Sequence, residues 1–187
     1  MANIGANSLT IAKCVEFRGS IEYSNQLHYK RIVNIDISPK YEDISEYADM
    51  NELEQKEELQ YVDLTVEVCE ITKEAETVML GHSINEEDEI VETFWDEPQT
   101  VGIGFVCRDQ INGKSYYTGF WIKKAKLHQS GDSHETIKDG FKYTTTELKG
   151  RAYPCSDGSW RKKKIFETKN QAQDWLDQTA GIKKEGA

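Results

Sequence analysis

The sequence predicts a mainly β protein, with a β-sandwich or barrel-like fold, one short helix packed on the sheet and a second helix at the C-terminal end. Three observations support this class. A hairpin signal lies near the middle of the chain, alternating apolar residues precede it, and two short stretches have helical spacing. The 187 residues are enough to bury a core, and we expect a single domain over residues 1–187.

The strongest signal is a hairpin over residues 101–127, centred on Asn112-Gly113. Asn-Gly favours a two-residue turn because both central residues of a type I′ turn need a positive φ. This turn sets the register, and one face then carries an apolar row of opposite residues: Ile103 with Ile122, Phe105 with Phe120, and Cys107 with Thr118. The other face pairs Gly104 with Trp121, Val106 with Gly119, and Arg108 with Tyr117. Because glycine in a strand marks close approach of another group, we expect this hairpin to be covered on both faces.

The remaining elements follow from periodicity. Residues 9–17, 28–37, 60–69, 141–153 and 160–166 are predicted strands, and we expect Pro39 to end the second of them. Residues 71–79 have helical spacing, with Thr72 as N-cap and Gly81 as the stop. Residues 168–180 form the predicted C-terminal helix, opened by a capping box of Thr168 and Gln171.

Residues 40–58 contain eight acidic side chains and are predicted to form a long loop, which is uncommon inside a compact domain unless it is functional or disordered. Two interpretations remain open. The segment is either a solvated loop or an acidic interaction arm that becomes ordered on a partner. In the second case the subunit-interface residues are Tyr41, Ile44, Tyr47, Asp49 and Met50.

Residues 86–97 carry seven acidic side chains and no basic one, together with Ile90, Val91, Phe94 and Trp95. The spacing of Asp and Asn lacks the central glycine of a calcium loop, so a charged edge strand is favoured over a metal site.

The charge is unevenly distributed along the chain. The net charge of −10 argues against a nucleic-acid backbone as the primary ligand. Residues 1–107 have a balance of −16, whereas residues 108–169 have a balance of +7. Such asymmetry fits head-to-tail self-assembly, and it equally fits charges that are interspersed on the folded surface.

The sequence contains no recognised catalytic motif, and the four histidines are not spaced as metal ligands on one element. We therefore predict no enzyme activity, no catalytic residue, no metal and no cofactor. The four cysteines are scattered and are expected to be free thiols. No apolar run is long enough to span a bilayer, and the first residues do not resemble a signal peptide, so we expect no membrane association and a cytoplasmic location at synthesis.

The order of segments resembles the major tail proteins, or tail tube subunits, of long non-contractile-tailed phages and prophages of Gram-positive bacteria. The resemblance rests on the acidic segment with Tyr47-Ala48-Asp49, on YVDLTVEVCEITKEAETVMLG, on EPQTVGIGFVCRDQINGKSYYTGFWIKKAKL and on GFKYTTTELKGRAYP. It covers most of the chain.

The resemblance implies a structural virion protein that closes into six-membered rings, which stack into a tube through which DNA passes without specific binding. Residues 40–58 would then be the stacking arm. The implied partners are further copies and the tape measure, tail terminator and distal tail proteins. The location would be the virion tail, reached from the host cytoplasm during assembly.

Two alternatives stay open. A phage-derived contractile or secretion apparatus uses a tube of the same architecture. A monomeric β-sandwich binding module would instead recognise a carbohydrate or peptide through Arg108, Tyr117 and Trp121, which are subunit-interface or core residues in the tail-tube interpretation.

Overall fold

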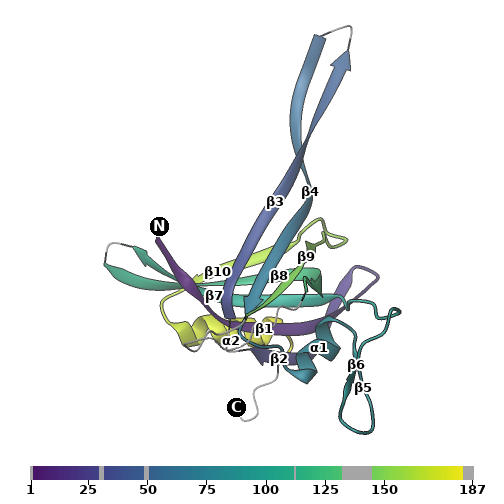
Figure 1. Ribbon diagram of the computed structural model, residues 1–187. Coiled ribbons are helices and arrows are strands. Elements are labelled where there is room, and N and C mark those ends of the chain that lie inside the picture. Colours follow the sequence, from purple (N-terminus) through teal and green to yellow (C-terminus); the bar gives the residue numbers. More distant parts are fainter. Residues whose placement is uncertain (1, 30–31, 49–50, 112, 132–144, 183–187) are drawn as a thin grey trace, which may run out of the picture.

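A computed structural model describes the backbone of residues 2–29, 32–48, 51–111, 113–131 and 145–182, and the side chains of these residues apart from 2–7, 43–48, 51–56 and 111. It confirms the mainly β class, because an eight-stranded antiparallel sheet dominates the described residues and two helices pack on it (Figure 1). No helix in these ranges is long and apolar enough to cross a membrane.

The strands of the large sheet run in the order β2-β1-β7-β8-β9-β4-β3, and β10 pairs with β8 beside this path. Their bounds are β1 Ala2–Phe17, β2 Ser20–Tyr29, β3 Ile32–Ala48, β4 Asn51–Val68, β7 Val101–Ile111, β8 Lys114–Gln129, β9 Thr146–Ala152 and β10 Arg161–Phe166. Strand β3 lies at one end of this order and β1 lies near the other end, yet the two strands contact each other. The sheet therefore curls over itself and makes a sandwich-like body.

The central hairpin has the predicted register. Strands β7 and β8 pair Ile103 with Ile122, Gly104 with Trp121, and Arg108 with Tyr117. Gly113 has a φ of +78°, as the turn requires, while Asn112 lies outside the described residues. The hairpin stands in the middle of the sheet, with β1 on one side and β9 and β10 on the other.

Two separate cores cover the two faces of this hairpin, as expected from the sequence. The inner core lies inside the curled sheet and includes Ile103, Phe105 and Ile122. The outer core lies under the C-terminal helix and includes Val106, Trp121 and the helix residues Ala172, Leu176 and Ala180. Alternation along each strand sends successive side chains to opposite cores.

Both helices begin where the sequence predicts. Helix α1, Lys73–Met79, has Thr72 as N-cap and packs Ala75, Val78 and Met79 into the inner core. Gly81 follows it with a φ of +83°, and an added Cβ there would lie 2.4 Å from the Glu97 carbonyl oxygen. Helix α2, Lys169–Thr179, has Thr168 as N-cap, whose side chain accepts a hydrogen bond from the Gln171 amide.

The early strands differ from the prediction. The predicted strand over residues 28–37 falls on two strands, because Tyr29 ends β2 and Ile32 begins β3, while residues 30–31 lie outside the described residues. Strand β2 itself turns back from β1 through Arg18 and Gly19, which have φ values of 49° and 81°. Pro39 does not end the strand. It lies on β3, which is at the edge of the sheet, the position in a sheet where proline is tolerated.

The segment over residues 86–97 is also different from the predicted edge strand. Only β6 Ile90–Val91 is a strand, and it pairs with β5 Ser83–Ile84 in a small ribbon beside the body. The rest of the segment is irregular, because charged and exposed residues outnumber the few apolar ones. The predicted strand over residues 141–153 is shorter, as β9 Thr146–Ala152, and residues 132–144 lie outside the described residues. All four cysteines are described, and none of them forms a disulfide, as predicted.

Glu16 joins the end of β1 to two other parts of the chain. Its carboxylate accepts hydrogen bonds from Lys124 Nζ at 2.6 Å and from the Ser156 amide at 2.8 Å. The bond from Lys124 is the largest cause of a lowered pKa for Glu16, from 4.5 to about 2. The charged carboxylate therefore stabilises the fold above the unfolded-state pKa near 4.5, and this contribution is lost as the pH falls towards 2.

We expect Glu16→Gln to lower the melting temperature at pH 6, and the difference from wild type to narrow as the pH is lowered from 4.5 to 2. Thermal unfolding followed by circular dichroism at several pH values measures this. The exposed Glu22 on β2 supplies the control, Glu22→Gln. A difference that does not change with pH would contradict the role of the Glu16 charge.

Candidate assembly interface

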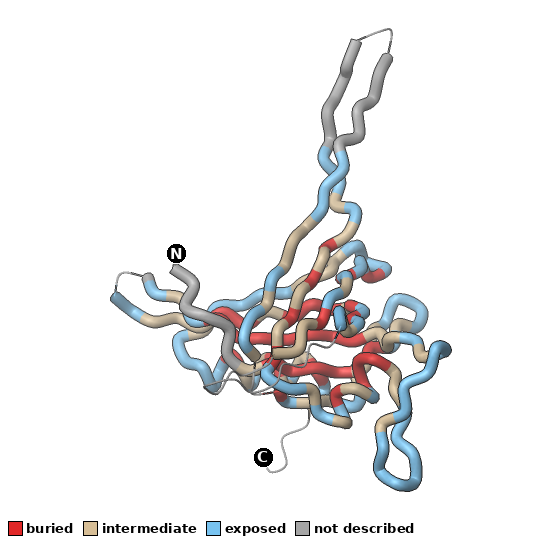
Figure 2. Tube along the Cα trace, in the orientation of Figure 1, coloured by how far each residue is buried: buried red, intermediate tan, exposed pale blue. Residues whose placement is uncertain are grey.

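The distal parts of β3 and β4 form a two-stranded arm that projects from the body (Figures 1 and 2). The two strands pair with each other from Tyr41 and Leu59 to Ala48 and Asn51. On the other side of β4, β9 pairs only over Val62–Val68, below the arm. The predicted long loop is thus wrong for the paired residues of 40–58, which are a β-ribbon extending the sheet.

The composition of the arm makes it a weak structure by itself. Its register sets acidic residues opposite one another at three positions: Glu42 with Glu58, Asp43 with Glu57, and Glu46 with Glu54. Like charges directly opposite one another destabilise a ribbon, and an isolated two-stranded ribbon is at best marginally stable in water.

The predicted interface residues of the arm are only partly placed. Tyr41 lies on β3 and its side chain is 61% exposed. Ile44 and Tyr47 lie further along β3, where only the backbone is described. Asp49 and Met50 lie outside the described residues. The role of these five residues in an interface stays a prediction.

The three predicted hairpin residues differ in environment. Arg108 is exposed and donates a hydrogen bond from Nη2 to Ser115 Oγ at 2.9 Å. Tyr117 is half-buried and packs against the outer core. Trp121 is fully buried in that core. These residues therefore do not form one open aromatic face.

Trp121 is held by specific contacts. Its indole N–H donates to the Tyr23 hydroxyl at 2.9 Å, and the two rings meet edge to face with centroids 5.0 Å apart. The Tyr23 hydroxyl in turn donates to the Lys123 carbonyl oxygen at 3.0 Å. Burial is the largest cause of the raised pKa of Tyr23, so this hydroxyl stays protonated and keeps donating.

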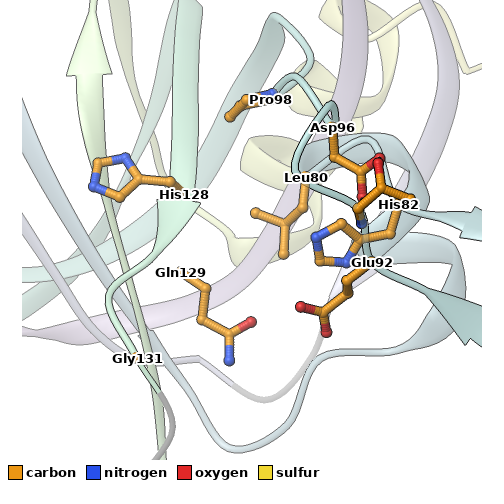
Figure 3. Close-up of a pocket in the computed structure, with 9 residues that line it drawn as sticks. Leu80, His82, Glu92, Asp96, Pro98, His128, Gln129 and Gly131 are labelled. Atoms are coloured by element: carbon orange, nitrogen blue, oxygen red, sulfur yellow. The ribbon is translucent and has the colours of Figure 1, made fainter.

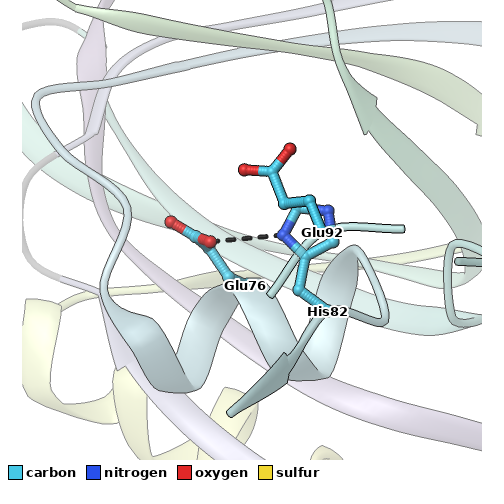
Figure 4. Close-up of side chains that lie close together, drawn as sticks. All are labelled: Glu76, His82 and Glu92. Carbon is cyan, nitrogen blue, oxygen red and sulfur yellow. Dashed lines mark hydrogen bonds and ion pairs between the residues drawn. The ribbon is translucent and has the colours of Figure 1, made fainter. Parts of the chain in front are cut away.

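A histidine and two glutamates meet beside α1 (Figure 4). Glu76 lies on α1, His82 follows the helix and Glu92 follows β6, and the possible ligand atoms lie within 4.8 Å of one another. His82 Nδ1 is 3.2 Å from Glu76 Oε2, and the two side chains are 13% and 17% exposed. A carboxylate that accepts Nδ1–H leaves Nε2 free, and nitrogen and oxygen ligands of this kind suit a divalent cation such as Zn²⁺.

An open pocket of about 360 Å³ adjoins this group (Figure 3). Its walls combine Leu80 and Pro98 with polar side chains, among them His82, Glu92 and His128. With acidic and imidazole groups at its rim, the pocket suits a cation or a small polar molecule better than an apolar ligand. Sequence spacing does not mark these residues, because they come from separate elements that only the fold brings together.

The sequence matches no known family model, and no curated protein matches it, so the resemblance to tail tube proteins rests on the segments quoted above.

Proposed function

We propose that this protein is a structural subunit that assembles with further copies of itself into rings, which stack into the tail tube of a long-tailed phage. The observation that carries the proposal is the arm formed by the distal parts of β3 and β4. The arm extends far from the core and carries three acidic pairs that an isolated ribbon tolerates poorly. A neighbouring ring gives such an arm a surface to bind.

The edges of the sheet are consistent with ring formation. Strands β2 and β3 end the strand order, and β10 is a further edge beside β8. Exposed edges present unpaired backbone groups, which a neighbouring subunit can pair. The basic β10 and the acidic arm, which lie on different parts of one chain, also favour contacts between unlike surfaces.

In this function the protein needs no catalysis and no cofactor. Its location is the virion tail, after assembly in the host cytoplasm. Its partners are its own copies and the other tail proteins named above, and DNA passes along the lumen. Carboxylates facing the lumen repel the DNA backbone, so the DNA moves without being bound.

In the alternative function, that of a monomeric binding module, Trp121 would be part of the face that binds the ligand. Trp121 is completely buried and helix α2 covers it through Leu176, so the indole ring has no exposed face on which a ligand could stack. Nothing in the geometry of the described residues favours this second function over the first.

Negative-stain electron microscopy of the purified protein at rising concentration tests the proposal, with mass measured by light scattering. We expect rings and then tubes with a central channel. A protein that stays monomeric over the whole range of concentration and salt would contradict the proposal.

A further inference from the structure

Two large aromatic side chains, Phe94 and Trp95, stand fully in solvent on the segment that follows β6. Phe94 is 105% exposed and Trp95 is 89% exposed, more than any other aromatic side chain among the described residues. Scattered apolar residues on a surface are ordinary, but adjacent exposed Phe and Trp residues are typical of the centre of a protein–protein interface.

The backbone that presents these two residues is held in one conformation. The Asp96 amide donates to the Thr93 carbonyl oxygen at 3.2 Å, which closes a turn with Phe94 and Trp95 at its central positions. The Asp96 carboxylate accepts from the Thr93 amide at 2.9 Å and from the Thr93 hydroxyl at 2.7 Å. A turn ordered before binding loses less conformational entropy when it binds. We call residues 93–96 the aromatic turn.

The surroundings of the aromatic turn are acidic. Residues 83–97 contain seven carboxylates and no lysine or arginine. Lys73 pairs with one of them, Asp88, with Nζ 2.5 Å from Oδ2. The complementary surface on a partner therefore has to combine basic side chains with a place for aromatic rings.

The same chain carries such a surface at β10. Four consecutive basic residues, Arg161 to Lys164, lie on this edge strand, and the exposed Lys162 and Lys164 share the face turned toward α2. Beside Lys162 lies a groove of about 490 Å³ between β2, β10 and α2, lined in part by Tyr23 and Trp175. We call β10 with this groove the basic edge.

The two surfaces lie on different sides of the subunit. The aromatic turn is attached to the C-terminal end of α1, where the Gln99 amide donates to the Met79 carbonyl oxygen, and α1 packs into the inner core. The basic edge borders α2, which covers the outer core on the opposite face of the sheet. A contact between these surfaces therefore joins two copies, and unlike patches on one subunit generate rings or filaments.

We propose that the aromatic turn of one subunit binds the basic edge of the next, with Phe94 and Trp95 on the groove and the neighbouring carboxylates facing Lys162 and Lys164. This inference rests on the proposed function, because it identifies a contact between neighbouring subunits.

The experiment compares the full-length wild type with a turn variant, Phe94→Ala/Trp95→Ala, and an edge variant, Lys162→Glu/Lys164→Glu. We expect each variant to need a concentration at least about tenfold higher than wild type before oligomers appear in sedimentation velocity. The control Lys126→Glu/Lys149→Glu changes the net charge by the same amount as the edge variant, at exposed sites outside β10. It should assemble like the wild type. All substituted side chains are exposed, so the variants should fold.

Mixing supplies the decisive measurement. Each variant keeps one intact half of the contact, so an equimolar mixture of the turn and edge variants should form 1:1 dimers that do not grow. If the wild type assembles but the turn variant assembles equally well, or if the mixture behaves as its separate components, this contact is wrong and the proposed function stands. If the wild type never assembles, both inferences fail.

Discussion

Replacing Trp121 with alanine is expected to lower the free energy of unfolding by about 3–5 kcal/mol, the usual cost of truncating a buried large aromatic residue. The indole is completely buried and contacts α2 and Tyr23. The close contact with β7 is visible at Gly104, where an added Cβ would lie 2.5 Å from Trp121 Cε3. Urea unfolding measures the loss, as a lower midpoint at an unchanged slope.

A matched control separates burial from residue type. Trp95→Ala removes an exposed indole and should change the free energy of unfolding by no more than about 0.5 kcal/mol. Gly104→Ala tests the same packing from the opposite strand and should cost about 1–3 kcal/mol through overpacking. A Trp121→Ala protein as stable as the wild type would contradict the outer core described here.

Shortening the arm is expected to abolish tubes while leaving the subunit folded. Tyr41 and Leu59 are paired residues, so replacing residues 42–58 with Asn-Gly joins β3 to β4 through a two-residue turn. Among the described side chains of β4, the buried ones begin at Val62, and these stay intact. Without the arm the subunits can still contact one another within a ring, but they lose the proposed contact between rings.

Electron microscopy of the shortened protein should show single rings or short oligomers at concentrations where the wild type forms tubes. The thermal unfolding transition supplies the control, because it should remain cooperative and close to that of the wild type. Long tubes of normal appearance would show that the arm does not connect the rings.

Much of the centre of the fold could be predicted from the sequence. Asn112-Gly113 and the alternation on both sides of it were enough to place Ile103 opposite Ile122 and Gly104 opposite Trp121. Helices α1 and α2 were marked by their N-caps, Thr72 and Thr168. These features depend on residues close together in the chain, where turn geometry and side-chain period act directly.

The arm could not be predicted as a ribbon. Its acidic composition and Pro39 both indicate a loop, yet Pro39 is tolerated because the sheet order leaves β3 at an edge. The exposure of Phe94 and Trp95 could not be predicted for a similar reason. The pattern of residues 86–97 is compatible with a half-buried strand, and only the structure shows that no described element covers these two side chains. The spacing of Glu76, His82 and Glu92 along the sequence does not match a metal-binding motif, and only the fold brings them together.

The sequence by itself therefore determined the β class, the central hairpin with its register, both helices and the uneven distribution of charge. Only the tertiary structure decided which strands are edges, which aromatic residues are buried or exposed, and which distant polar residues meet. The reason is physical: turns, caps and alternation are local interactions, whereas edge position and exposure depend on which distant segments pack against a residue.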